Sequence, residues 1–167
     1  MTGPQQPKPI DARGPRFGAG ITFVLSVAAL VTGLIGGFER TAAERAASPA
    51  FILLAIAWLA FALGTFFGNG ASPWSIIFRA LVQPRLSKPA PTEDARPPRF
   101  ALGVGFALST AGLVLDLVGV PWALEVAAAF IVIASFLNAF ANFCLGCQMY
   151  LLLVRAGIIR VRTPIAS

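Results

Sequence analysis

Residues 11–36 read DARGPRFGAGITFVLSVAALVTGLIG, and residues 94–119 read DARPPRFALGVGFALSTAGLVLDLVG. Fifteen of the 26 aligned pairs are identical, and they include a polar start of the form Asp-Ala-Arg-x-Pro-Arg-Phe. A common bias toward apolar residues would match some leucines and alanines, but it would not reproduce this polar heptad. The two stretches therefore indicate an internal duplication, in which each copy begins a long apolar helix.

The composition around these copies predicts an all-α integral membrane protein. Hydrophobic residues make up 57% of the 167 positions and charged residues 12%, whereas soluble domains carry about 25% charged residues. A helix needs about 20 apolar residues to cross a bilayer. The stretches that meet this length are residues 17–38, 49–67, 100–119 and 121–142. We predict four transmembrane helices in a single membrane domain, residues 1–167, with a flexible N-terminus at residues 1–10.

The basic residues predict an orientation. Eleven of the 13 lysines and arginines fall before the first span, between the second and third spans, or after the fourth. The other two, Arg40 and Arg45, lie between the first and second spans. By the positive-inside rule both termini and the long middle loop are cytoplasmic. The net charge of +6 then reflects membrane topology and anionic lipid, and it calls for no nucleic-acid partner.

The duplication further predicts two tandem two-helix repeats, at about residues 11–85 and 94–160. The second helices align with an offset of 72, which places Ser72-Pro73-Trp74-Ser75 opposite Cys144-Leu145-Gly146-Cys147. Each repeat then ends in a short interfacial helix, at residues 76–82 and 148–154. An even number of spans per repeat relates the halves by a parallel pseudo-twofold axis along the membrane normal.

Cys144 and Cys147 are the only cysteines, and they form a Cys-x-x-Cys pair directly after the fourth span. This spacing suits reversible dithiol chemistry, because one thiolate can attack a sulfur atom and the other can resolve the product. We expect Cys144 to be the N-cap of a short helix and the attacking thiolate, and Cys147 to resolve. The alternative is that both only pack as small apolar residues.

We expect no bound metal and no cofactor. The chain has no histidine, and two thiolates are only half of a tetrahedral zinc site. A homo-oligomer that joined two thiol pairs across a symmetry axis is the one arrangement that would complete such a site.

Other polar residues are candidates for binding a substrate. Arg13, Arg16, Arg96 and Arg99 recur at the starts of the two copies. They could hold a sulfur oxyanion near the thiols, anchor the topology, or pair with Asp11 and Asp94 to fix the helix starts. Asn138 and Asn142, four residues apart, are expected on one face of the fourth span, as contacts between helices or as a polar pocket. Asp116 and Glu125 flank the turn on the outer side, where an ion or proton site and ordinary interfacial carboxylates both remain open.

The segments DARGPRF, DARPPRF and NFCLGCQMYLLL resemble the bacterial membrane proteins grouped as domain of unknown function 4395, over essentially the whole chain. Each half also resembles, more distantly, the two-helix membrane segment of some rhodanese-type proteins, in which a Gly-Phe-Cys turn follows the second helix. The resemblance implies thioredoxin-like or sulfurtransferase partners and singles out Cys144 and Cys147. The first half departs from a scheme with two dithiols, because Ser72 and Ser75 stand where cysteines would be needed.

These observations lead to three hypotheses about function. The first is a membrane thiol–disulfide or sulfur-relay protein whose dithiol faces the cytoplasm and serves thioredoxin-like or rhodanese-type proteins. The second is a small transporter or channel for a sulfur oxyanion, lined by the asparagines and arginines. The third is a non-catalytic membrane anchor subunit, which needs only the helices and the basic loop.

Overall fold

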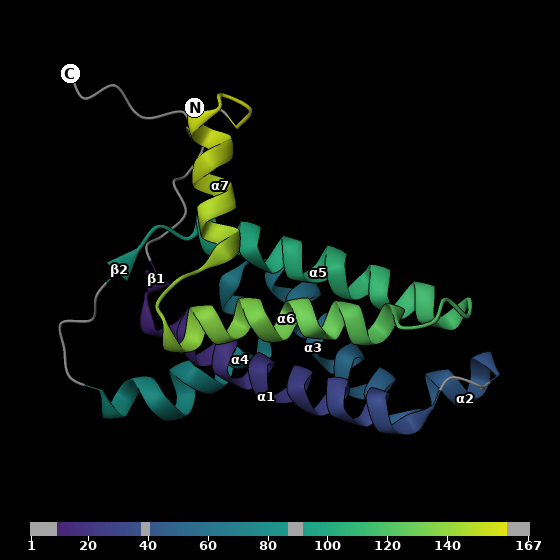
Figure 1. Cartoon of the computed structure of the whole chain (residues 1–167). Coiled ribbons are helices and arrows are strands. Elements are labelled where there is room, and N and C mark those ends of the chain that lie inside the picture. The colour runs from purple at the N-terminus through teal and green to yellow at the C-terminus, as the bar shows by residue number, and fades with distance from the viewer. Residues whose placement is uncertain (1–9, 38–40, 87–91, 160–167) are drawn as a thin grey trace, which may run out of the picture.

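The computed structural model describes residues 10–37, 41–86 and 92–159, and these are helical apart from one short pair of strands (Figure 1). The long helices are α1 (Arg13–Gly36), α3 (Pro49–Phe67), α5 (Arg96–Leu117) and α6 (Ala123–Phe140). The short elements are β1 (Ile10–Asp11), α2 (Ala42–Ala46), η1 (Asn69–Ala71), α4 (Pro73–Ile77), η2 (Phe78–Val82), η3 (Gln83–Arg85), β2 (Thr92–Glu93) and α7 (Leu145–Arg155). The expected flexibility of residues 1–9 lies outside the described residues.

Four helices of the described chain are long and apolar enough to cross a membrane, as predicted. Their most apolar windows have mean hydropathies between 1.8 and 2.4. The bounds of α3 agree with the prediction because its ends carry strong local signals. Ser48 Oγ accepts a hydrogen bond from Phe51 N–H at 3.2 Å, Pro49 opens the first turn, and Gly68 ends the helix at a φ of +96°.

The helices α1 and α5 start earlier than predicted, at the arginine of each Asp-Ala-Arg motif. Asp11 Oδ1 accepts a hydrogen bond from Arg13 N–H at 3.0 Å, and Asp94 Oδ1 accepts one from Arg96 N–H at 2.9 Å. Each aspartate thus satisfies a backbone donor that the helix itself leaves free. The repeated polar heptad is therefore the start of a helix, and hydropathy alone missed these first turns.

The long helices form a ring in the order α1, α3, α5, α6. The most extensive packing joins helices far apart in sequence, α1 with α6 and α3 with α5. Helices adjacent in the sequence, α1 with α3 and α5 with α6, pack over a smaller area. The diagonal pair α3 and α6 has few contacts. The bundle is therefore held together mainly by contacts between the two halves of the chain.

Many of the most buried side chains in this ring are small. Ala29, Ala128, Ser26 and Ser109 are all 0% exposed, as is the larger Leu54, and small residues let membrane helices approach closely. Large apolar residues point outward, and many along the four long helices are about half exposed or more. Such a surface is suited to lipid rather than to water.

The ring has two different ends (Figure 1). The hairpin end carries α2 and the turn between α5 and α6. The thiol end carries β1, β2, α4 and the start of α7, which projects away from the bundle. β1 pairs with β2 in antiparallel fashion, with Ile10 opposite Glu93 and Asp11 opposite Thr92. This strand pair is absent from the predicted all-α fold, and it forms because the segments leading into α1 and α5 meet at one end of the ring.

The fourth span ends earlier than predicted. α6 stops at Phe140, and Asn142 adopts the left-handed conformation with a φ of +56°. Phe143 N–H closes the turn by donating to Leu137 O at 3.0 Å. Asparagine tolerates a positive φ better than most residues do. Asn142 therefore lies outside the helix that was expected to contain it.

Candidate functional site

The two thiols lie in the first turn of α7. Cys144 is the N-cap residue, with φ −86° and ψ 103°, and its Sγ accepts a hydrogen bond from Cys147 N–H at 3.3 Å. The helix continues from it, since Gln148 N–H donates to Cys144 O at 3.0 Å. The expected position of Cys144 at the N-cap is confirmed. Both cysteines are free and partly buried.

A glycine between the thiols lets α7 lie directly against α5. A methyl group added at Gly146 would come within 2.5 Å of Ala101 Cβ and 2.6 Å of Ala101 Cα. Four residues beyond Gly146, the ring of Tyr150 lies 5.7 Å from that of Phe100. These contacts hold the dithiol beside the first turns of α5.

The two thiols differ in acidity. The hydrogen bond from the Cys147 side chain lowers the pKa of Cys144 to about 7, helped by the backbone N–H groups of Cys147 and Gly146, while burial opposes the shift. The same hydrogen bond raises the pKa of Cys147, and burial and the charge of Cys144 act in the same direction. Cys144 is therefore the more acidic of the two thiols and has the more thiolate character near neutral pH, whereas Cys147 keeps its proton to higher pH.

This acidity predicts how alkylation of Cys144 depends on pH. Only the thiolate reacts, so the rate with iodoacetamide should rise about tenfold per pH unit below 7 and level off above it. The rate is measured for the wild-type protein and for Cys147→Ala, which keeps the backbone N–H donor and leaves Cys144 as the single thiol. Because this variant lacks the strongest acidifying contact, its midpoint should lie above that of the wild-type protein and below the ordinary thiol value of about 8.5. Wild-type and variant midpoints that both equal the ordinary value would contradict the assignment.

Glu93 is a member of this site that sequence reasoning missed. It lies on β2, and its negative charge disfavours ionisation of both Cys144 and Cys147. Burial raises the pKa of the Glu93 carboxyl, while the positive charge of Arg16 on α1 acts against that shift. No motif in the sequence marks Glu93, which lies on β2 opposite Ile10 of β1.

The four candidate arginines have separate roles. Arg13 forms an ion pair with Asp11 at 3.0 Å, and this contact lowers the pKa of Asp11. Arg99 donates from Nε to Thr65 O at 2.9 Å and from Nη2 to Phe66 O at 3.1 Å, which caps the C-terminus of α3. Arg96 is held through its backbone N–H by Asp94, and Arg16 faces Glu93. Arg13 thus fits the alternative in which an Asp–Arg pair fixes the start of a helix. These contacts do not bring the four arginines together into one anion site.

Asn138 and Asn142 do not share a helix face. Asn138 is half-buried within α6, whereas Asn142 is exposed in the turn beyond it. The expectation of an asparagine pair on one face of the span was wrong, because the helix ends between them.

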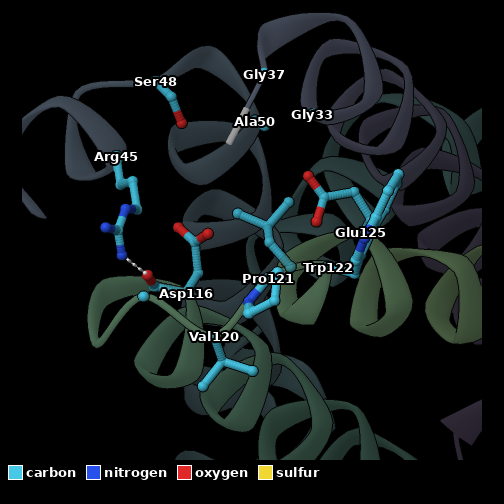
Figure 2. Close-up of a pocket in the computed structure, with 12 residues that line it drawn as sticks. Gly33, Gly37, Arg45, Ser48, Ala50, Asp116, Val120, Pro121, Trp122 and Glu125 are labelled. Atoms are coloured by element: carbon cyan, nitrogen blue, oxygen red, sulfur yellow. Dashed lines mark hydrogen bonds between the residues drawn. The ribbon is translucent and has the colours of Figure 1, made fainter. Parts of the chain in front are cut away.

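A second polar site lies at the hairpin end, far from the thiols along the bundle. Figure 2 shows the side chains of Arg45, Asp116 and Glu125 around a cavity of about 70 Å³. Arg45 donates from Nη1 to Asp116 O at 2.7 Å and so caps the C-terminus of α5. Asp116 and Glu125 thus line one cavity, in which the arginine has a structural role.

These features define the class: an α-helical protein with four candidate membrane spans and a Cys-x-x-Cys pair that caps a short helix at one end of the bundle. The family model described as "Domain of unknown function (DUF4395)" matches residues 10–155, and the chain belongs to this family. The match runs from β1 to the last residue of α7 and so includes every element described above. The resemblance to domain of unknown function 4395 is confirmed, and the one to the rhodanese-type membrane segment stays a prediction. The chain matches no curated protein and no solved structure.

Proposed function

We propose that this protein is a membrane thiol–disulfide or sulfur-relay protein of the bacterial plasma membrane, with both termini and the thiol end in the cytoplasm. The orientation rests on the 11 basic residues in the N-terminal, middle and C-terminal segments, against two in the first hairpin loop. The starts of α1 and α5 and the start of α7 lie together at one end of the bundle (Figure 1). Among the described residues, the arginines at the starts of α1 and α5 therefore lie at the same end of the bundle as the dithiol.

The tandem-repeat arrangement belongs to this proposal, and equivalent contacts in the two halves support it. The Phe17 and Phe78 rings are 5.7 Å apart, as are the Phe100 and Tyr150 rings. Phe17 and Phe100 are equivalent under the offset of 83 that aligns residues 11–36 with 94–119. Phe78 and Tyr150 are equivalent under the offset of 72 that aligns the second helices. At equivalent positions, a methyl group added at Gly18 would lie 3.3 Å from Trp74 Cβ, and one added at Gly146 would lie 2.5 Å from Ala101 Cβ.

The strand pair is also consistent with a pseudo-twofold axis. Ile10 and Glu93 are equivalent positions under the offset of 83, and they lie opposite each other in the β1–β2 pair. An antiparallel pair related by a twofold axis must place equivalent residues opposite each other at the axis. The proposed axis therefore passes close to Glu93.

The short helices at the thiol end fit the role of interfacial helices. On α7, Met149, Leu151 and Leu152 are 46%, 41% and 61% exposed, and on the α4–η2 segment Ile76 and Leu81 are 52% and 55% exposed. Apolar side chains of this size, close to the ends of membrane spans, are suited to the boundary between headgroups and acyl chains.

The observation that carries the proposed activity is the N-cap position of Cys144, with its Sγ 3.3 Å from Cys147 N. In the reaction, the Cys144 thiolate attacks one sulfur of a partner disulfide, an S–S bond forms to Cys144, and the other partner sulfur leaves as a thiolate. Cys147, as a thiolate, then attacks Cys144 Sγ and releases the second partner sulfur. The partner disulfide is reduced by two electrons and the dithiol is oxidised.

Trapping the mixed disulfide tests this proposal. Cys147→Ser should leave a thioredoxin-like or rhodanese-type partner bound covalently to Cys144, and mass spectrometry of the non-reduced complex would identify the linked cysteines. Cys144→Ser is the matched control and should trap no partner. A wild-type protein that forms no Cys144–Cys147 disulfide under mild oxidant, together with no adduct in Cys147→Ser, would rule the relay out and leave the transporter and anchor hypotheses.

A further inference from the structure

The polar cavity at the hairpin end lies where all four candidate membrane spans begin or end (Figure 2). Its wall takes residues from the last turns of α1 and α5 and from the first turns of α3 and α6. The ends of membrane spans lie at the level of lipid headgroups. A molecule in this cavity would therefore have polar groups of the protein around it and lipid next to it.

The charges on the wall favour a cation. The described wall residues that carry charge are Arg45, Asp116 and Glu125. Arg45 Nη1 donates to Asp116 O at 2.7 Å and to Leu117 O at 3.5 Å, so the arginine charge is opposed by the negative end of the α5 dipole. Figure 2 shows the two carboxylates directed into the same space. Two negative charges thus face the cavity, against one positive charge that caps a helix.

Glu125 is the wall residue whose charge has no partner. Within the part of the chain that the structure describes, its carboxylate makes no hydrogen bond and no ion pair. The side chain lies directly against α1, since a methyl group added at Gly33 would come within 2.8 Å of Glu125 Oε1. Glu125 is partly buried, and a carboxylate that is withdrawn from water without a partner is destabilising. A bound cation with N–H donors would offset this effect.

Ser48 adds a buried polar group to the same wall. It is 8% exposed, and Figure 2 shows its hydroxyl directed into the cavity. Ser48 Oγ accepts a hydrogen bond from Phe51 N–H at 3.2 Å, but no residue in the described ranges accepts the hydroxyl hydrogen. This hydrogen can be donated to an oxygen atom that enters the cavity together with the cation.

The volume of the cavity limits the cation that it can hold. A volume of about 70 Å³ gives room for roughly five to seven atoms of the size of a water molecule. An aminoethyl group with its ester oxygen fits this space, and its ammonium offers N–H donors to both carboxylates. A trimethylammonium group is larger and offers no such donor. We propose that the cavity binds the primary ammonium headgroup of a phospholipid such as phosphatidylethanolamine.

The apolar part of the wall favours a lipid over a free amine. Val120 and Trp122 line the cavity and are 42% and 50% exposed. Tryptophan is enriched where membrane helices meet the headgroups, and an indole ring also attracts a nearby ammonium group. The glycerol and acyl parts of a lipid would cover these side chains, whereas a free amine would contact only the polar wall.

Native mass spectrometry of the full-length protein in detergent micelles tests this site. The protein is titrated with phosphatidylethanolamine or with phosphatidylcholine of the same acyl chains, and the wild-type protein should bind the first about tenfold more tightly. Glu125→Gln keeps the shape of the side chain, removes its charge and should lose this preference. Gly33→Ala keeps the charge but displaces the carboxylate, so it should weaken phosphatidylethanolamine binding as well. Glu44→Gln is the matched control, because Glu44 is exposed on α2 and lies outside the cavity wall.

Equal binding of the two lipids by the wild-type protein, or a preference that survives in Glu125→Gln, overturns the proposal. Loss of the preference in Glu44→Gln as well would show that surface charge causes it, and this result also overturns the cavity site. Phosphoethanolamine at the same concentration should not displace the lipid, and displacement would overturn the assignment to a lipid. The thiols take no part in this binding, so failure of the lipid site would leave the relay intact, and failure of the relay would leave the lipid site.

Discussion

Replacing Gly112 with alanine is expected to lower the free energy of unfolding by about 2–3 kcal/mol, as overpacking of a tight interface does. Gly112 lies on α5 where it crosses α6, and an added methyl group would come within 2.4 Å of Ala127 Cβ. Neither methyl group can rotate away, because a Cβ position is set by the backbone. The helices must therefore separate, and the close packing that stabilises this interface is lost.

The same interface offers a rescue for the Gly112→Ala variant. Ala127→Gly removes the methyl group that clashes, and the next neighbour of the added Cβ is Ala123 O at 3.5 Å, so the double variant should recover most of the loss. Gly20→Ala is the matched control, because a methyl group there meets nothing within 4 Å. The measurement is the midpoint of unfolding in mixed micelles titrated with dodecyl sulfate. Equal midpoints for Gly112→Ala and Gly20→Ala would contradict the structure.

Gly146→Ala is expected to have the largest effect on the thiols without altering either of them. The new methyl group would overlap Ala101 Cβ and Cα, at 2.5 and 2.6 Å, and would push α7 off α5. An isolated 11-residue helix is marginally stable in water, since helices shorter than about 12–15 residues depend on tertiary packing. The N-cap geometry would then be lost in much of the population.

This loss should appear in the reactivity of both cysteines. The alkylation midpoint of Cys144 should move from about 7 toward the ordinary value of about 8.5, and the partly buried Cys147 should become more accessible to alkylation. Gly103→Ala is the control on α5, where the added methyl group meets Thr65 Cγ2 at an ordinary 3.7 Å. Tandem alkylation and peptide mass spectrometry would report both sites. A Gly146→Ala protein with the wild-type midpoint would show that α7 keeps its structure without α5.

Local patterns predicted most of the secondary structure. A run of about 20 apolar residues has few alternatives to a membrane-spanning helix, because every backbone polar group must be satisfied within it. The start of α3 was predictable from Ser48 and Pro49. The starts of α1 and α5 were missed because they depend on Asp11 and Asp94 as hydrogen-bond acceptors, which hydropathy does not register.

The candidate site could be predicted only in part. The sequence by itself determined the spacing of Cys144 and Cys147, and the alignment with Ser72-Pro73 was enough to predict Cys144 at the N-cap of a helix. Glu93, the capping role of Arg99 and the contact of Gly146 with Ala101 join residues that are tens of positions apart. Such contacts depend on which helices become neighbours in the ring and on the positions along each helix at which they pack together. Only the tertiary structure decided them, because side-chain packing between helices, and not the pattern along one helix, sets those positions.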